Sequence, residues 1–467
     1  MAWRFGMRIL GLVSTLVLVR LLAPADFGLI ALATGFMQSV DGLMSLGTEE
    51  AVIRVRAPDR AVYDTAFTLT ALRGLVASLL VAVAAYPAAR FFGDARLGPV
   101  LLVVAVLPLL DGLSNIGAVD FRRNMTFHKE FALMVLPKLG GILVAILAAF
   151  LLRSYVAMLC GILVNRVLRT AMTYVMHPFR PRISLRAWRA LVGYSVWTWV
   201  LSLAALLRDR SDSLFLGRMT GVATLGFYSV GAEVAALPMT ELIEPLGRAS
   251  FAGFAAARHE GAAVGEIFVR LIGFSALLAL PMGLGLSAVA APLTRLALGP
   301  GWEAAVPVLQ VLGVAGTMLV FGHLSQHLLS AHALLGRLVG ITLAGAALRV
   351  GLLAVLIPGF GATGAAWAAA LAIGVEQGLM VVTALRRFGI GIEALVAQVW
   401  RPVLASGVMG AVLWGLGWGW VPAAGLVGAV LVGACVFVVG LLGAWVLAGR
   451  PAGAEADVLG LVRRWLG

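Results

Sequence analysis

The feature that most constrains this chain is a series of apolar stretches, each long enough to cross a bilayer, that follow one another from end to end. A helix of about 20 apolar residues spans the hydrocarbon core. Only 12% of the residues are charged and 61% are hydrophobic, whereas a soluble protein carries roughly a quarter charged residues. We therefore predict an all-α polytopic membrane protein with about 14 transmembrane helices, at residues 4–22, 27–49, 64–88, 97–118, 130–151, 154–176, 191–216, 221–244, 264–290, 303–327, 333–357, 361–384, 397–420 and 424–448.

Basic residues collect in every second connection between these expected helices. One side of the membrane receives most arginines, among them Arg166, Arg169 and Arg401, which are counted here with the loop charges. The opposite side receives only Arg20, Arg90, Arg96, Arg153, Arg218 and Arg295. Because Lys and Arg accumulate in cytoplasmic loops, we predict that both termini are cytoplasmic. The same rule accounts for the net charge of +13, so no nucleic acid is expected as a partner.

The first apolar stretch has some features of a secretory signal, with Ala23-Pro24-Ala25 at the position of a cleavage site. Arg20 interrupts the approach to that site, and cleavage would remove one copy of a repeat in the sequence. We therefore expect the stretch to be retained as the first helix. Cys160 and Cys435 each lie in an apolar run, which argues against a disulfide framework.

An internal repeat divides the expected helices into two sets. Arg20 is followed eight residues later by Gly28, and Arg218 is followed eight residues later by Gly226. Helices one to six and seven to twelve match in order, and an offset of an even number of helices makes the two copies parallel in the membrane. We therefore predict two parallel six-helix lobes and the following boundaries: an N-lobe at 1–176, a cytoplasmic linker at 177–190, a C-lobe at 191–384, two extra helices at 385–448 and a cytoplasmic tail at 449–467.

Ionisable residues occur inside many of the expected spans, where charge is costly and marks a function or a paired structural role. The basic set is Arg73, Lys138, Arg208, Arg210 and Arg349. The acidic set is Asp41, Asp111, Asp209, Asp212, Glu233 and Glu376. They either pair among themselves to fix helix register or line a water-filled cavity between the lobes. We favour the cavity, because the groups are spread over many spans.

The two sets suit different ligands. Arginine binds phosphate through its planar fork, so the basic set is expected to bind a pyrophosphate. Asp41, Asp111, Asp212, Glu233 and Glu376 are candidates for ion pairs or for coupling to H+ or Na+, and the sequence alone does not separate coupling groups from substrate ligands.

Other chemistry is not indicated by the sequence. His323 and His327 share a helix face, but no glutamate follows His323 in an H-E-x-x-H pattern, so no metal site is expected. No P-loop and no catalytic triad order occur. We therefore expect neither an enzyme nor a resident cofactor. The stretches Asn124–Phe131 and Arg180–Arg189 alternate basic and aromatic residues, which is typical of segments that lie along the anionic inner leaflet or that serve simply as topology anchors.

Three segments resemble a known family. They are RLLAPADFG from Arg20, FRRNMTF from Phe121, and the segment from Asp212 through LGR to LGFYSV ending at Val230. The chain resembles the Wzx-type polysaccharide and O-antigen flippases of the multidrug/oligosaccharidyl-lipid/polysaccharide (MOP) exporter superfamily. This resemblance implies a MATE-like bundle with a cationic central cavity, which moves undecaprenyl-diphosphate-linked oligosaccharide across the bacterial inner membrane by alternating access.

The resemblance also bears on partners and alternatives. It implies cooperation with other polysaccharide-assembly proteins, such as a polymerase and glycosyltransferases. The buried acids and bases are nearly balanced here, which departs from a strongly cationic cavity. A cation-coupled multidrug exporter of the same fold is the alternative, with Asp41, Glu233 and Glu376 binding cation and drug. A ligase or polymerase is disfavoured, because the expected outer loops are too short to carry catalytic residues.

Overall fold

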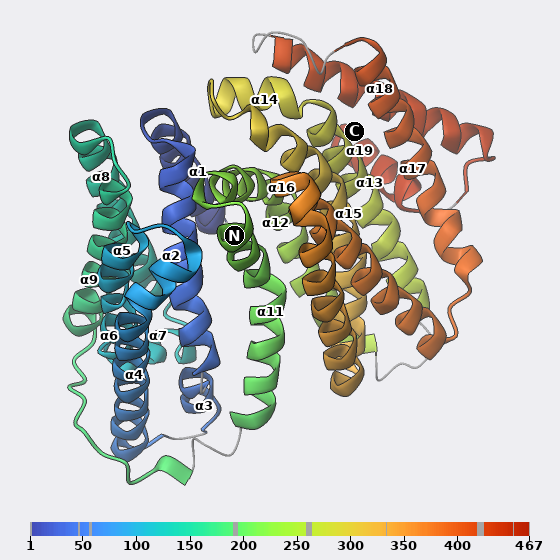
Figure 1. The fold of residues 1–467 in the computed structure, drawn as a ribbon. Helices are drawn as coiled ribbons and strands as arrows, with labels where there is room; N and C mark the ends of the chain where they lie inside the picture. Colours follow the sequence, from blue (N-terminus) through green and yellow to red (C-terminus); the bar gives the residue numbers. More distant parts are fainter. Residues whose placement is uncertain are drawn as a thin grey trace. The chain divides into compact units, whose positions relative to one another are not determined.

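The computed structural model of the chain describes residues 2–44, 47–55, 58–189, 195–257, 264–332, 334–417, 425–451 and 453–466. All regular secondary structure in these residues is helical, and they contain no β-strand (Figure 1). The all-α fold class is therefore confirmed. The chain divides into two compact units, Met1–Gly226 (unit 1) and Phe227–Gly467 (unit 2).

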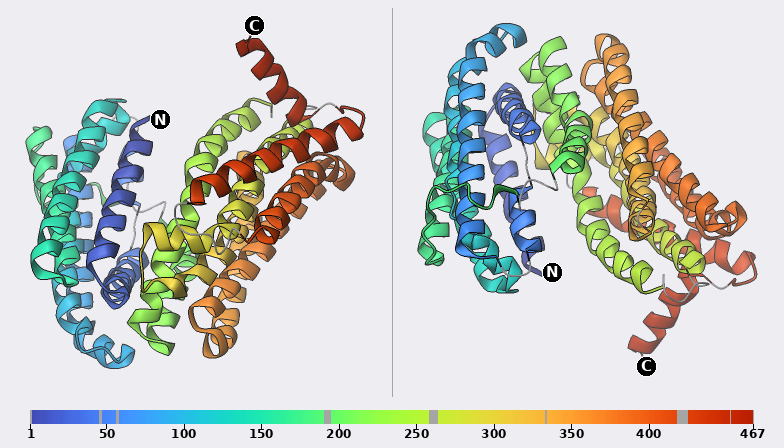
Figure 2. Two further views of the ribbon diagram at one scale, coloured as in Figure 1. Left: turned by 90° about the horizontal axis from the view of Figure 1, so that it is seen from above. Right: turned by 90° about the horizontal axis from the view of Figure 1, so that it is seen from below.

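Unit 1 is built from long helices joined by short ones. The long helices are α1 (Ala2–Leu21), α2 (Pro24–Leu43), α4 (Arg60–Phe92), α8 (Phe127–Leu152), α9 (Val156–Met176) and α11 (Ser195–Met219). The short ones are α3 (Thr48–Arg54), α5 (Leu97–Val104), α6 (Val106–Gly112), η1 (Ile116–Val119) and α7 (Asp120–Arg123). Helices α8 and α9 lie side by side in both views of Figure 2.

Unit 2 begins within α12 (Val222–Ala257), whose first residues belong to unit 1. The remaining elements are α13 (Val264–Ala288), α14 (Ala290–Ala297), η2 (Glu303–Ala305), α15 (Val306–Ala331), α16 (Leu335–Phe388), α17 (Ile392–Gly415), α18 (Leu426–Leu447) and α19 (Ala454–Leu466). The predicted lobe boundaries concern the symmetry of the repeat and stay a prediction.

Local sequence explains where the long helices begin, end and bend. Helix α4 starts where the Asp59 carboxylate accepts a hydrogen bond from the Val62 N–H (3.0 Å), and it ends at Gly93, whose φ of 75° is the left-handed conformation that suits glycine. Helix α16 contains Gly361 with φ 54° and ψ −129°, three residues after Pro358. That break separates the two spans expected at 333–357 and 361–384.

Several helices are long and apolar enough to cross a membrane. Among the described residues, nine helices meet that description, or ten if the bent pair Leu97–Gly112 and Ile116–Arg123 forms one span. Each expected span has a helix at its position. The total of fourteen spans stays a prediction.

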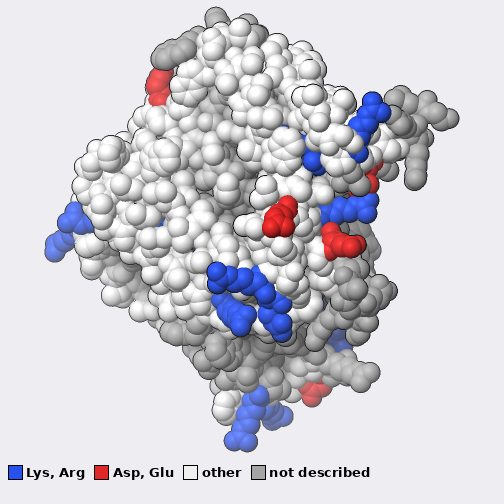
Figure 3. All heavy atoms as spheres, turned by 90° about the vertical axis from the view of Figure 1, so that its right-hand side faces the viewer, with Lys and Arg blue, Asp and Glu red and all other residues white. Residues whose placement is uncertain are grey.

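Large apolar side chains face outward on these helices. On α18, Val427 is 68%, Val439 70% and Leu447 90% exposed. The face shown in Figure 3, on the side of α17 and α18 in Figure 1, is largely free of charged residues. Exposed apolar surface on this scale would be unfavourable in water but suits contact with lipid tails. The chain is a multi-pass membrane protein.

The repeated glycines contact each other's helices at the start of α2 and α12. A Cβ added to Gly28 would lie 1.7 Å from the Val222 carbonyl oxygen, and a Cβ added to Gly226 would lie 1.8 Å from the Pro24 carbonyl oxygen. The same spacing along the chain separates Pro24 from Val222 and Gly28 from Gly226. The contact is therefore reciprocal, as expected for two copies of one motif related by a local two-fold axis.

Candidate functional site

The candidate site is a polar cavity inside unit 1, between α4, α6, α8 and α9. Its volume is about 260 Å³. A water molecule occupies roughly 30 Å³ of liquid, so the cavity has room for several waters or a small anionic group. It is lined by Glu49, Thr70, Arg73, Asp111, Ser114, Asn115, Ile116, Ala118, Val119, Phe121, Arg122, Glu130, Leu133, Met134, Arg166, Arg169 and Thr173.

Two glycines bring the charged residues beside them into this cavity. A Cβ on Gly74 would lie 2.3 Å from the Pro108 carbonyl oxygen, and a Cβ on Gly112 would lie 2.6 Å from the Thr70 carbonyl oxygen. The absence of side chains therefore lets α4 and α6 approach backbone to backbone. The neighbours of these glycines, Arg73 and Asp111, consequently line the same cavity.

A sharp bend after α6 forms the polar wall of the cavity. The helical segments on either side of it meet at 69°. The Asn115 side-chain oxygen accepts a hydrogen bond from the Gly117 N–H (3.0 Å), and the Asn115 N–H donates to the Thr173 hydroxyl of α9 (2.9 Å). These bonds satisfy backbone groups that the bend leaves outside a helix.

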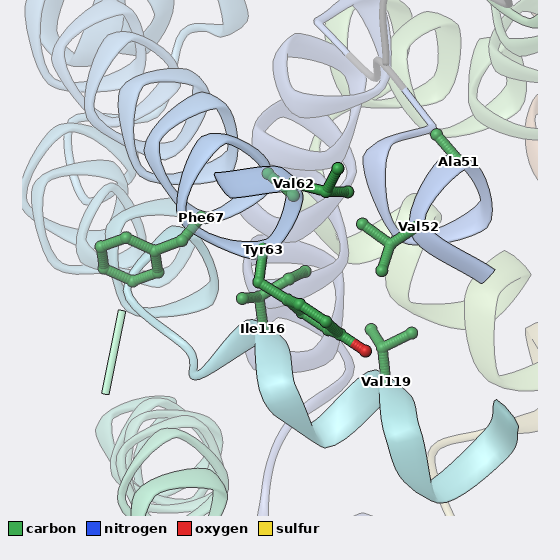
Figure 4. Packing of buried hydrophobic residues seen from close by; sticks show 8 residues of the cluster. Ala51, Val52, Val62, Tyr63, Phe67, Ile116 and Val119 are labelled. Carbon is green, nitrogen blue, oxygen red and sulfur yellow. The ribbon is translucent and has the colours of Figure 1, made fainter. Parts of the chain in front are cut away.

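Beside the bend, a hydrophobic cluster joins α3, α4 and η1 (Figure 4). It consists of Ala51, Val52, Val62, Tyr63, Ala66, Phe67, Ile116 and Val119. The Tyr63 hydroxyl donates a hydrogen bond to Asp120. This cluster fixes η1 against α4, so the wall of the cavity is anchored by apolar packing.

Two ion pairs lie along the cavity. Nη2 of Arg73 is 3.6 Å from Oδ1 of Asp41, and Nη1 of Arg166 is 3.0 Å from Oδ1 of Asp111. All four side chains are between 22% and 30% exposed. The first pair is too long for a hydrogen bond, and the Arg73 Nε has no hydrogen-bond partner among the described residues although it is buried. A buried donor without a partner is costly and is available to a ligand.

The arginines at the cavity are paired unequally with carboxylates. Arg122 contacts the carboxylates of Glu49 (3.3 Å) and Glu130 (2.9 Å). Arg169 forms no ion pair with any residue that the structure describes. Because Arg122 contacts two carboxylates while Arg73 and Arg166 have one each, the Arg169 guanidinium is left over for an incoming anion.

The structure brings together three of the residues predicted for the site: Asp41, Arg73 and Asp111. The other predicted residues of unit 1 lie elsewhere. Lys138 on α8 faces α1, where its Nζ is 3.2 Å from the position of a Cβ on Gly11. On α11, Arg208 donates to Asp209 (2.8 Å), while Arg210 is half-buried and Asp212 is buried.

The remaining predicted residues belong to unit 2. Glu233 is an exposed residue of α12, Arg349 is half-buried on α16, and Glu376 is 3% exposed. The carboxylate of Glu376 lies against Gly345 of the first half of α16. Their roles as ligands or coupling groups stay predictions.

Sequence reasoning missed Arg166 and Arg169 as site residues, because both were counted with loop charges. In the structure they lie inside α9, with Thr173 on the same helix face. Their position within the expected helix 154–176 and their spacing were the signal that could have identified them. Arg122, Glu49 and Glu130 were missed as well, since their meeting depends on packing between α3, α7 and α8.

The cavity is suited to bind an anion reversibly. Guanidinium groups that are partly hydrated and incompletely paired can exchange water for phosphate oxygens. The described residues contain no group of three or more His, Cys, Asp or Glu that could hold a metal ion.

Similarity to solved structures extends over nearly the whole chain. Lipid II flippase MurJ in an inward closed conformation superposes with a TM-score of 0.77 at 13% identity, covering 96% of this chain and 99% of that one. An inward-facing multidrug resistance MATE family transporter of the MOP superfamily gives a TM-score of 0.62 at 15% identity, covering 82% and 94%. The chain therefore has the fold that MurJ and this MATE family transporter share.

Sequence comparison then gives the family. The model of the family described as polysaccharide biosynthesis protein matches residues 17–307. This is more than half of the chain, and the chain belongs to that family.

Two curated relatives agree with this assignment. The lipopolysaccharide biosynthesis protein WzxC of Escherichia coli K12 is 26% identical over 337 residues, which cover 69% of this chain and 67% of that protein. The succinoglycan biosynthesis transport protein ExoT of Rhizobium meliloti is 23% identical over 317 residues, covering 68% and 64%. The chain thus spans about two thirds of the length of these relatives. The resemblance to polysaccharide flippases is confirmed.

Proposed function

We propose that this chain moves an undecaprenyl-diphosphate-linked oligosaccharide, the repeat unit of an O-antigen, capsule or exopolysaccharide, across the bacterial inner membrane by alternating access. Membership of the polysaccharide biosynthesis family and the flippase-like fold support this proposal. The relatives named for lipopolysaccharide and succinoglycan biosynthesis point to the same class of substrate.

The observation that carries the proposal is the arginine-rich cavity of unit 1. A lipid-linked oligosaccharide consists of a sugar part that varies between substrates, an apolar chain, and a diphosphate that is the same in all of them. The diphosphate is the part that a transporter can recognise by charge. Arg73, Arg166 and Arg169 would bind its oxygens, and the carboxylates Asp41 and Asp111 would limit the affinity so that the substrate can leave.

The charge balance also favours ion coupling. A carboxylate that pairs with arginine in one state and is freed in another can take up H+ or Na+, which couples transport to an ion gradient. We assign this role to Asp41 and Asp111, with Asp212, Glu233 and Glu376 as further candidates. The protein acts as a transporter and not as an enzyme, with both termini in the cytoplasm and with the polymerase and glycosyltransferases of polysaccharide assembly as its partners.

The test compares two double variants in a strain whose own copy is deleted. Arg73→Ala with Arg169→Ala removes two of the four cavity arginines, and Arg208→Ala with Arg349→Ala removes two predicted ligands outside the cavity. We expect the first variant to lose surface polysaccharide by at least tenfold at normal protein level and to accumulate lipid-linked oligosaccharide on the cytoplasmic leaflet. Arg90→Ala, an exposed change on the same helix α4, is the matched control.

Four outcomes separate the alternatives. Unchanged polysaccharide in the Arg73/Arg169 variant contradicts the assignment of this cavity, and loss in the Arg208/Arg349 variant alone moves the site there. Accumulation on the outer leaflet would indicate a polymerase or ligase step. Normal polysaccharide with lost resistance to cationic drugs would favour the multidrug exporter.

A further inference from the structure

The chain between α9 and α11 forms a strap, residues 177–189, that is fastened to unit 1 by its backbone. Residues 177–185 have no regular secondary structure. In Figure 1 the strap continues from the lower end of α9 and passes beneath α4. It therefore follows directly from a helix that crosses the membrane and passes the first turn of another.

One face of α4 supplies the acceptors that hold the strap. The Arg182 N–H donates to the Asp64 carboxylate (2.8 Å), the Ser184 N–H donates to the Thr68 hydroxyl (2.9 Å), and the Ala187 N–H donates to the Thr65 hydroxyl (3.1 Å). Thr68 lies four residues after Asp64 and three after Thr65, so it shares a helix face with each of them. Because backbone groups make these bonds, the strap's own side chains are not needed to attach it.

Further contacts hold the two ends of the strap. The Asn115 side-chain amide donates to the Phe179 carbonyl oxygen (2.7 Å), and Phe179 and Ala187 pack against the hydrophobic cluster of Figure 4. The strap is thus held in unit 1 by its backbone and its inward side chains, whatever its exposed side chains contact.

Its outward side chains combine apolar bulk with positive charge. Ile183 is 85%, Leu185 51% and Trp188 47% exposed. The arginines between and around them are also exposed: Arg180, Arg182, Arg186 and Arg189. The structure gives Arg182 and Arg186 no side-chain partner among the described residues, and the strap carries no acidic residue.

We propose that this strap binds the headgroups of anionic lipids in the leaflet that it borders. Exposed Ile, Leu and Trp are unfavourable in water but stable at the boundary between headgroups and acyl chains. Each arginine near an anionic bilayer surface adds to the attraction. The position beside the ends of two membrane-spanning helices brings the strap to that boundary, so the lipid surface is the occupant that charge and place both fit.

The proposal does not depend on the transported substrate. A nitroxide label is attached to Ile183→Cys in the full chain, with Cys160 and Cys435 replaced by serine. The protein is placed in nanodiscs of phosphatidylcholine with increasing phosphatidylglycerol. Contact of the label with the bilayer is measured by the balance of collisions with oxygen, which dissolves in lipid, and with a water-soluble nickel complex.

We expect the label to move from water into the bilayer boundary as phosphatidylglycerol rises. The double variant Arg182→Ser/Arg186→Ser should require on the order of tenfold more anionic lipid for the same change. The charge-matched control is Arg386→Ser/Arg387→Ser, two exposed arginines at the end of α16, which should leave the titration unchanged. Trp188→Ser should weaken the contact even in the presence of all four arginines.

Three results would overturn the proposal. The label could stay in water at every lipid composition, or it could enter neutral and anionic bilayers equally, or it could be protected only in native membranes. The last result would assign the strap to an acidic protein partner. Transport assays are not part of this readout, so failure of the lipid contact is distinguishable from failure of the proposed function.

Discussion

The two units of this protein each contain an arginine–carboxylate pair, and the two pairs differ in burial and in hydrogen bonding. In unit 2, Arg401 of α17 and Glu455 of α19 form hydrogen bonds of 2.7 and 3.2 Å, and their side chains are only 4% and 2% exposed. In unit 1, Arg73 and Asp41 approach to 3.6 Å without a hydrogen bond and are 22% and 29% exposed beside a cavity.

The difference shows how to distinguish a structural charge from a working one. In a closed pair, such as Arg401–Glu455, two fixed hydrogen bonds replace the water around the charges. Removing either partner therefore leaves the other charge buried and unpaired. In an open pair, such as Arg73–Asp41, the side chains are partly exposed to solvent and retain donors that make no hydrogen bond. They can therefore bind a ligand at little cost in free energy. Arg401–Glu455 therefore attaches helix α19 to α17, whereas the open Arg73–Asp41 pair fits the role in substrate binding that we propose for this cavity.

The largest effect is expected from breaking the closed pair. Glu455→Ala leaves the Arg401 guanidinium buried without a counter-charge, which costs about 3–5 kcal/mol. We expect the free energy of unfolding in detergent to fall by this amount and protease to cleave the tail near α19. The measurement is a denaturant titration with parallel proteolysis.

The neighbouring exposed pair is the control for this change. Arg270 and Asp457 also join α13 to α19, but Arg270 is 65% exposed. Asp457→Ala should cost about 1 kcal/mol or less. Equal losses in the two variants would contradict the distinction between closed and open pairs.

A smaller effect on stability is expected from the open pairs. Asp111→Asn removes the partner of Arg166, whose side chain is 27% exposed and can be hydrated. The free energy of unfolding should change by about 1 kcal/mol or less, while surface polysaccharide falls several-fold because the cavity gains a second uncompensated guanidinium and releases a diphosphate more slowly. A large loss of folded protein with unaltered specific transport would show that this pair is structural.

Much of the fold could be predicted from the sequence, because apolar length and turn residues act locally. The break at Gly361 falls where the expected spans 333–357 and 361–384 meet, and the repeat of Arg20–Gly28 at Arg218–Gly226 marks two helix starts that contact each other. Neither inference needs knowledge of distant contacts.

Less of the site could be predicted from the sequence, because the site depends on which helices pack against each other. Arg73 and Asp111 lie together only because Gly74 and Gly112 let α4 and α6 come into backbone contact. Arg401 was counted with cytoplasmic loop charge, although it is buried against Glu455 in a segment expected to be a tail. A charge count along the sequence does not distinguish a hydrated arginine from one that packing has enclosed.

The smallest effect concerns His177, the first residue of the strap and an open ionisable group of unit 1. Burial lowers the pKa of this imidazole below its ordinary value; Asp120 opposes the shift, and Lys129 and Arg180 add to it. Its Nδ1 accepts a hydrogen bond from the Phe179 N–H (3.2 Å), and its Nε2 is 3.5 Å from Asp120. The neutral ring is therefore the form that fits the strap.

The sign of the pH dependence follows from this lowered pKa. At a pH below the ordinary imidazole pKa of about 6.5, His177 binds a proton more readily when the strap is detached than when it is docked. The docked state therefore loses stability as the pH falls. Protonation also removes the acceptor for the Phe179 N–H.

We expect hydrogen exchange of the strap amides to increase modestly between pH 7.5 and pH 5, after correction for intrinsic rates. His177→Gln should abolish that pH dependence, whereas His128→Gln, a change at an exposed histidine of α8, should keep it. Slower exchange at acid pH would mean that the charged ring, paired with Asp120, is the form that holds the strap, and the attachment would then be a salt bridge of the kind that unit 2 uses for α19.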